Sequence, residues 1–135
     1  MKKTIIASTV VIAMIALFTF SSCKKTTETF DIIGRWTLSS YSLNGADQTT
    51  AYKASHVNYS INFDASKNYI ETYTDITGTN ISNAGAWTLP NNGSDIQLTN
   101  STNSSTRTLH IIKITGTTAD LTETNGTQEY HWLKN

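Results

Sequence analysis

The side chains most able to do chemistry are three histidines, a set of scattered carboxylates and one cysteine. His56, His110 and His131 are the only imidazoles in the 135-residue chain. His110 and His131 fall on different predicted strands with a third between them, so shared binding of one metal ion would be strained. His110 has the strand parity of Ile112 and Ile114, and we expect it to face the interior or the rim with a hydrogen-bond partner. The pattern predicts no metal site.

The carboxylates do not form a pair suited to general acid and base catalysis. The carboxylates include Glu71, Asp75, Asp95, Asp120, Glu123 and Glu129, which are scattered along the chain. Glu71 lies between Tyr69 and Tyr73, and we expect it on a solvated face. Nucleophile elbows, phosphate-binding glycine loops and Cys-His pairs are missing. We therefore expect no enzyme activity, no catalytic residue and no cofactor.

Charge and cysteine content exclude further classes of protein. Ten positive residues balance ten negative ones, which gives no clustered basic face for nucleic acid. Cys23 is the only cysteine, so a disulfide framework within the chain is excluded. Hydrophobic residues make up 38% of the chain, but 14 of them lie in residues 1–22. The remaining body is rich in Ser, Thr and Asn, is long enough for one domain, and is expected to be monomeric.

The N-terminal segment has the organisation of a secretory signal. Met1-Lys2-Lys3 is a positively charged start, and Thr4 to Phe20 is an apolar stretch with small Ser and Thr interruptions. An uncleaved membrane anchor is the alternative, although a span needs about 20 apolar residues. Ser21-Ser22-Cys23 follows, placing two small residues before a thiol where the hydrophobicity ends. A free or buried structural thiol is the alternative interpretation of Cys23.

Ser21-Ser22-Cys23 resembles the lipobox of bacterial lipoproteins, with Phe20 where Leu is commonest. The resemblance implies that the Cys23 thiol takes a diacylglycerol and that its acyl chains bind the membrane. Residues 1–22 would then be a lipoprotein signal peptide and residues 23–29 a lipid-anchored tether, leaving residues 30–135 as the domain. Lys24-Lys25 in place of an acidic run implies retention on the periplasmic face of the outer membrane.

The pattern of residues in the body of the chain predicts short β-strands, and no segment spaces its apolar residues with the period of a helix. In His56 to Asp64, Val57, Tyr59, Ile61 and Phe63 alternate with polar residues, as in a half-buried strand. Tyr69 to Thr74 is predicted to return as the second strand of a hairpin. The other predicted strands are Ile32 to Leu43, Gly85 to Leu89, Ser94 to Thr99, Thr106 to Thr115, Ala119 to Thr124 and Gln128 to Leu133. Gln48 to Ser55 is predicted to be either a long loop or one short helix over an opening.

About eight strands with short turns favour a meander that closes as a barrel or packs as a sandwich. Four motifs follow one another along the chain: Gly34-Arg35-Trp36, the segment Tyr59–Asp64, Gly85-Ala86-Trp87 and the segment Ile112–Leu121. This series resembles the small lipocalin-like domain lipoproteins of Bacteroidota. The resemblance implies an all-β fold, an eight-stranded antiparallel up-and-down barrel with Trp36 near one closed end. The resemblance to this family implies no particular biochemical activity.

Aromatic side chains are the candidate binding residues. Those expected to point inward are Trp36, Tyr59, Phe63, Trp87, Tyr130 and Trp132. An eight-stranded barrel is either filled by such side chains or just wide enough for one small ligand. The first hypothesis is a binding protein for a small apolar or amphiphilic molecule, contacted by Trp36, Tyr59, Phe63, Trp87 and Trp132. The alternative is a non-catalytic structural or protein-interaction module with a filled barrel and a docking surface at Thr99 to Thr108.

Overall fold

A computed structural model of the chain describes residues 32–135. The predicted signal peptide, Cys23 and the tether lie outside the described residues, so the domain boundaries proposed above remain predictions.

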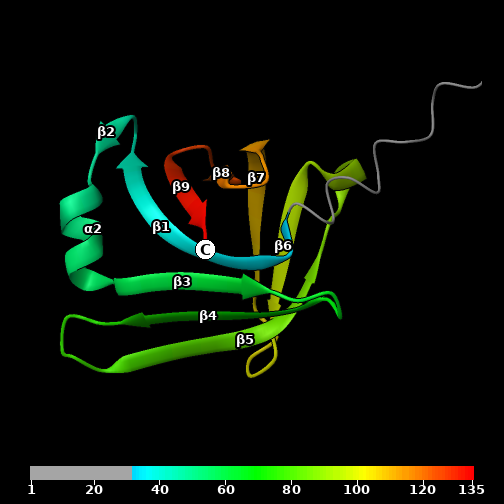
Figure 1. The fold of residues 1–135 in the computed structure, drawn as a ribbon, viewed down its shortest axis with the longest axis horizontal. Helices are drawn as coiled ribbons and strands as arrows, with labels where there is room; N and C mark the ends of the chain where they lie inside the picture. Colours follow the sequence, from blue (N-terminus) through cyan, green and yellow to red (C-terminus); the bar gives the residue numbers. More distant parts are fainter. Residues whose placement is uncertain (1–31) are drawn as a thin grey trace, which may run out of the picture.

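The described chain folds into one continuous antiparallel sheet (Figure 1). Its strands are β1 (Gly34–Leu43), β2 (Ala46–Asp47), β3 (Val57–Phe63), β4 (Asn68–Thr74), β5 (Asn80–Thr88), β6 (Asp95–Asn100), β7 (Thr106–Ile114), β8 (Thr118–Glu123) and β9 (Gln128–Lys134). The sheet order is β2-β1-β3-β4-β5-β6-β7-β8-β9, and β1 also pairs with β9. Closure by this last pairing removes the two open edges that an eight-stranded sheet would expose.

The predicted eight-stranded up-and-down barrel is confirmed. The two-residue β2 adds only a short pairing with the end of β1, at Ser42 and Leu43. The largest boundary difference is in β5, which begins at Asn80 rather than at the predicted Gly85. Apart from Ile81, small or polar residues occupy this extension, so it lacks the aromatic alternation that marked the other strands. Every residue of this extension, from Asn80 to Ala84, pairs with β4.

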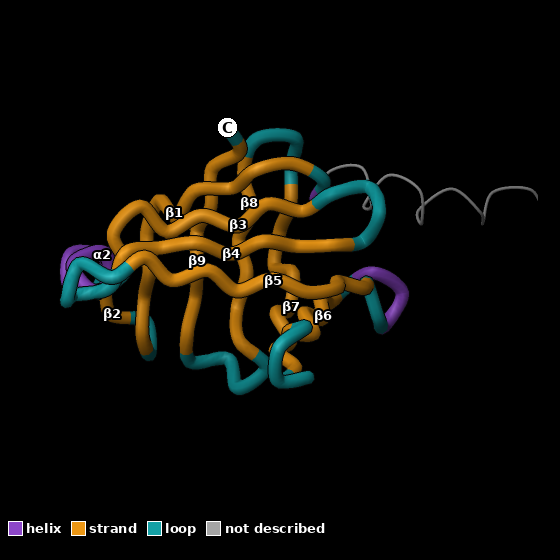
Figure 2. The backbone as a smooth tube through the Cα atoms, turned by 90° about the horizontal axis from the view of Figure 1, so that it is seen from below, coloured by secondary structure: helices purple, strands orange, loops and turns teal. Residues whose placement is uncertain are grey.

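Two short helices lie at opposite ends of the long axis of the barrel (Figure 2). The helix α2 (Thr49–Ser55) occupies the segment for which a loop or a short helix was predicted. Asp47 accepts hydrogen bonds from the backbone N–H and the hydroxyl of Thr49, at 2.9 and 2.6 Å, and so fixes the start of this helix. The 3-10 helix η2 (Asn91–Gly93) precedes β6 at the other end.

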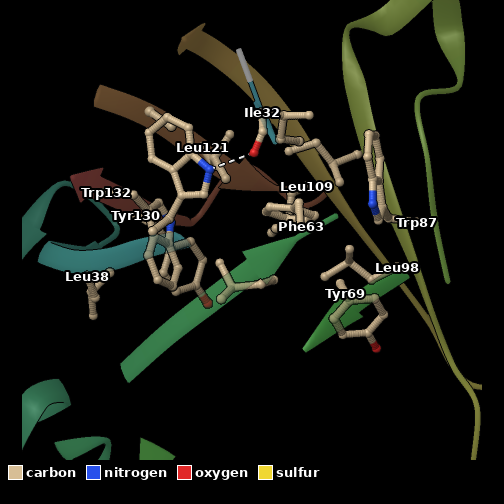
Figure 3. Packing of buried hydrophobic residues seen from close by; sticks show 14 of the residues in the cluster. Ile32, Leu38, Phe63, Tyr69, Trp87, Leu98, Leu109, Leu121, Tyr130 and Trp132 are labelled. Carbon is tan, nitrogen blue, oxygen red and sulfur yellow. Dashed lines mark hydrogen bonds between the residues drawn. The ribbon is translucent and has the colours of Figure 1, made fainter. Parts of the chain in front are cut away.

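The barrel core is built from the aromatic residues that the sequence placed inside. All six are buried, with exposed fractions between 0% for Trp87 and 4% for Tyr59. In Figure 3, Tyr130 and Trp132 lie on one side of the cluster and Trp87 on the other, with Phe63 and Leu109 between them. The Trp36 indole N–H donates to the carbonyl oxygen of Ile32 at 2.7 Å. The ammonium nitrogen of Lys134 lies 5.2 Å from the centre of the Trp36 ring, a cation–π contact.

Gly85 is the residue of β5 at which the pairing with β6 ends. β5 pairs with β4 from Asn80 to Ala86, whereas it pairs with β6 only from Gly85 to Thr88. A Cβ atom on Gly85 would lie 1.9 Å from the backbone carbonyl oxygen of Thr99. Glycine is therefore required here because the two backbones approach too closely for a side chain.

We expect Gly85→Ala to lower the free energy of unfolding by about 2 kcal/mol, because the new methyl group must displace a backbone rather than a flexible side chain. Urea denaturation of the wild type and the variant measures this difference. Gly116→Ala is the matched control, since a Cβ at Gly116 meets nothing within 4 Å. Equal denaturation midpoints for the two alanine variants would contradict the prediction.

Candidate functional site

The apolar interior of the barrel is almost completely filled. A void of about 10 Å³ remains, and its walls include Trp36, Tyr59, Phe63 and Trp132, four of the five predicted ligand contacts. This volume corresponds to roughly one water-sized probe. Trp87 does not line it and packs edge-on against Phe63, with ring centres 5.6 Å apart. The structure gathers the predicted contacts into one core, and their role in binding a ligand stays a prediction.

Glu71 corrects one prediction from the sequence, because it is buried rather than solvated. Its exposed fraction is 8%, and its strand neighbour Ile70 is 49% exposed. Alternation along β4 therefore directs Glu71 into the barrel together with Tyr69, which is 4% exposed. A carboxylate between two tyrosines suggested a wet face, but here the tyrosines and the carboxylate all belong to the inner face.

The carboxylate of Glu71 is hydrogen-bonded through both oxygens. Oε1 accepts from the hydroxyl of Tyr59 and from Nη1 of Arg107, the latter at 3.0 Å. Oε2 accepts from the side-chain amide of Asn83 at 3.2 Å. Burial of a carboxylate is costly unless its charge is paired and its oxygens are hydrogen-bonded, and both conditions hold here.

Arg107 is the centre of this polar cluster and holds two carboxylates. Its Nη1 lies 3.0 Å from Glu71, and its Nε lies 2.7 Å from Oε1 of Glu123. Its guanidinium carbon also lies 5.2 Å from the centre of the Tyr130 ring. Arg107 was not predicted from the sequence as a site residue. The available signal was its strand parity with Leu109, which is 2% exposed.

The same contacts fix the charge states of the cluster. Burial raises the pKa of the Tyr59 phenol well above its ordinary value, and the nearby charge of Glu71 adds to that rise. Burial also raises the pKa of Tyr130. For Arg107, burial alone would lower the pKa, but the surrounding tyrosines and carboxylates raise it overall. At neutral pH, Tyr59 is therefore a neutral hydrogen-bond donor, and Arg107 is a cation.

A pocket of about 200 Å³ opens beside this ion pair, where β5 and β6 diverge beyond Gly85. Glu71 and Arg107 form part of its wall, and the remaining lining residues are Tyr69, Asn83, Leu98, Asn100, Asn103 and Ser105. None of the five predicted ligand contacts lines this pocket. Sequence reasoning missed it because its residues come from β4, β5, β6, β7 and the Ser101–Ser105 loop, and side chains of the non-paired β4 and β7 meet only where the sheet curls.

An aromatic cluster lies next to the ion pair, beneath α2. Tyr52 of the helix stacks on Tyr41 with ring centres 4.1 Å apart, and on His56 at the same separation. The Tyr52 ring also lies 6.0 Å from those of Tyr59 and Tyr130, both of which hydrogen-bond to members of the polar cluster. The helix therefore covers this end of the barrel through a single inserted tyrosine.

His110 has the expected hydrogen-bond partner, but it faces outward. Its Nδ1 lies 2.7 Å from Oδ1 of Asp95, and its side chain is 53% exposed. The parity argument failed because Leu109 and Ile111 take the inward positions of β7, so alternation turns both His110 and Ile112 outward, Ile112 at 55% exposure. Among residues 32–135, no group of three or more potential metal-ligating side chains comes together.

We expect the Asp95 contact to make the fold sensitive to acid. Hydrogen bonds from Asn91 and His110 lower the pKa of the Asp95 carboxyl below its ordinary value. A lowered folded-state pKa means that the carboxylate stabilises the fold at pH above about 4, and that this contribution disappears as the pH falls through the lowered pKa. Urea denaturation between pH 6 and about 2 should therefore show a steeper acid loss in the wild type than in Asp95→Asn. Parallel profiles would contradict this account.

The fold and the site together define a class of protein. A closed antiparallel barrel of eight strands is the architecture in which lipocalins hold one small ligand. The family model of the lipocalin-like domain matches residues 32–118, and the chain belongs to this family. The resemblance drawn from the sequence is thus confirmed.

Two solved structures share this fold. A lipocalin-like protein from Bacteroides uniformis superposes with a TM-score of 0.61 at 16% identity, covering 78% of this chain and 99% of that one. An uncharacterized protein from Bacteroides eggerthii gives a TM-score of 0.59 at 14% identity, covering 77% and 99%. No curated protein matches the chain. Within residues 32–135, no helix has the length and hydrophobicity needed to cross a membrane.

Proposed function

We propose that this protein is held by a lipid on Cys23 at the periplasmic face of the outer membrane and binds one small amphiphilic molecule at the barrel. The observation that carries the binding proposal is the 200 Å³ pocket beside the Glu71–Arg107 ion pair. Ligand sites combine concave apolar surface with a few placed polar groups, and this pocket has both. Leu98 and Tyr69 supply the apolar side of its wall.

The sequence left apolar and amphiphilic ligands open, and the two cavities favour the amphiphilic class. The void among the aromatic side chains has about 10 Å³, which is too small for an organic molecule. The larger space adjoins a buried ion pair and several amides. A purely apolar ligand there would leave charged and amide groups desolvated without partners, which is costly.

Mass spectrometry of co-purified small molecules tests the binding proposal. The acylated protein in nanodiscs is incubated with a cell-envelope extract, washed and analysed. We expect one class of bound molecule that Ser105→Trp abolishes, because an indole at this lining position would fill the pocket. Thr102→Trp is the matched control, since Thr102 lies in the same loop but does not line the pocket. Retention in Ser105→Trp, or no bound molecule in the wild type, would refute the proposal.

Lipid anchoring has its own prediction. We expect labelled palmitate to enter the wild-type protein in cells and to be absent from Cys23→Ala, because the thiol is the acceptor of the diacylglycerol. Autoradiography of the immunoprecipitated protein measures the incorporation. Incorporation that persists in Cys23→Ala would refute the anchor. Protease accessibility in intact cells separates the periplasmic from the exposed face.

The second candidate function is a non-catalytic interaction module with no small ligand. The filled aromatic core favours it, since the core residues then serve packing alone. Its docking surface would be Thr99 to Thr108. Crosslinking in the native cell tests this candidate, and we expect Thr102→Trp to weaken recovery of a partner if it is correct.

A further inference from the structure

The charges around the pocket do not balance. Arg107 contributes one positive charge and is shared by Glu71 and Glu123, which contribute one negative charge each. The Tyr59 phenol stays neutral because burial raises its pKa. The net charge of these side chains is therefore negative. An anionic ligand group would find no cation that is not already paired with a carboxylate. A low-dielectric wall makes such a mismatch expensive.

Several hydrogen-bond donors on the pocket wall have fixed orientations and no partner among the described residues. Oδ1 of Asn100 accepts from the backbone N–H of Thr102 at 2.8 Å, and Oδ1 of Asn103 accepts from that of Ser105 at 3.0 Å. These bonds identify which amide atom is the oxygen in each side chain. The other amide atom, Nδ2, is therefore an NH₂ donor in both Asn100 and Asn103. Nη2 of Arg107 is a third donor that makes no hydrogen bond within residues 32–135.

The same wall also offers acceptors. Asn83 uses its amide NH₂ on Glu71, which leaves its Oδ1 as an acceptor. Oε2 of Glu71 accepts only that one hydrogen bond among the described residues, and a carboxylate oxygen can take a second. Donors and acceptors therefore face one small space together. A carboxylate group can only accept, and an ammonium group can only donate, so either would leave half of the wall unsatisfied.

On the basis of the binding function proposed above, we propose that this pocket binds a neutral polyhydroxylated group, such as the sugar ring of a glycolipid or of a free saccharide. Each hydroxyl both donates and accepts a hydrogen bond, which matches a wall of mixed polarity and needs no compensating charge. The pocket volume of about 200 Å³ leaves room for a single sugar ring.

The chain offers a reporter for this site. Arg35 and Arg107 are its only arginines, and Arg107 lines the pocket whereas Arg35 does not. Their ¹⁵N-labelled side-chain Nε–H signals can be followed in the acylated, nanodisc-held protein, with Arg35 as the internal reference. The probes are three methyl hexosides (glucoside, galactoside and mannoside), octyl glucoside, propionate and propylammonium, with free concentrations corrected for partition into empty nanodiscs.

We expect at least one glucoside or hexoside probe to shift the Arg107 signal saturably, with a Kd at least tenfold below those of propionate and propylammonium. Saturation by octyl glucoside alone identifies a glycolipid head group as the source, and equal binding of a methyl hexoside identifies a free sugar. Equal or tighter binding of either charged probe, or no saturable shift with any sugar probe, overturns the inference.

An isosteric variant tests the donor side of the pocket. Asn103→Asp keeps the oxygen that accepts from Ser105 but removes the NH₂ donor, so sugar binding should weaken about tenfold and propylammonium binding should strengthen. Asn125→Asp is the control, since Asn125 caps the backbone N–H of Thr127 in the same manner and does not line the pocket. Unchanged sugar affinity in Asn103→Asp would contradict the assignment of the Asn103 NH₂ as a donor to the sugar.

The failures of the two proposals can be told apart. If a charged probe binds and Ser105→Trp abolishes that binding, the binding function stands and the sugar assignment falls. If no probe shifts the Arg107 signal and no envelope molecule co-purifies, both fall.

Discussion

Replacement of Arg107 by methionine should lower the free energy of unfolding by about 3–5 kcal/mol, because it leaves two partly buried carboxylates without their cation. The guanidinium lies 3.0 Å from Glu71 and 2.7 Å from Glu123, and the Glu71 side chain is only 11% exposed. The flexible methionine side chain retains much of the packing, so most of the loss is electrostatic. Urea denaturation at pH 7 measures it.

A double-mutant cycle separates charge from packing in this result. Glu71→Gln combined with Arg107→Met should recover part of the stability, since an amide is far less costly to bury than an unpaired carboxylate. Lys113→Met is the matched control, since Lys113 is an exposed cation on the same strand. A loss for Arg107→Met no larger than that for Lys113→Met would mean that the cluster contributes little to the fold.

Truncation of Trp87 to alanine should cost a comparable amount, about 3–5 kcal/mol, through the cavity it leaves. Trp87 is 0% exposed, and its indole N–H donates to the carbonyl oxygen of Asp64 at 3.2 Å. The Lys67 ammonium also lies 3.8 Å from the centre of its ring. Loss of this side chain therefore loosens both the core and the turn between β3 and β4.

Two further variants calibrate the Trp87 prediction. Trp87→Phe keeps a ring in the core and should lose clearly less stability than alanine. Leu133→Ala removes a large apolar side chain that is 49% exposed, and its cost should stay near the surface range of about 0.5 kcal/mol. Equal losses for Trp87→Ala and Leu133→Ala, read from the same denaturation curves, would contradict the core role of Trp87.

The barrel was predictable because its strands alternate in residue type. Tyr59, Ile61 and Phe63 on β3 are 4, 4 and 3% exposed, as the pattern of apolar and polar residues required. Turn residues such as Asn44 and Gly45 marked the breaks between strands, and both adopt positive φ angles. Local patterning therefore determined the number of strands and the composition of the core.

The polar pocket was not predictable, because it depends on contacts across the barrel. Glu71 and Arg107 are 36 residues apart and belong to strands that do not pair with each other. A lone carboxylate on a Thr-rich and Tyr-rich strand gives no local sign of a partner so distant. The outward position of His110 was also missed, because Ile112, which shares its strand parity, is apolar and yet exposed.

Closure of the barrel by its terminal strands has a consequence for the order of folding. β1 pairs with β9 in a register that joins Trp36 to Lys134, so this pairing waits until β9 has been synthesised. Contacts of such high sequence separation form slowly. Because the chain is synthesised from its N-terminus, it cannot complete the barrel until β9 has been made. The same pairing makes β9 a sensitive element, because loss of a few of its residues would reopen the sheet.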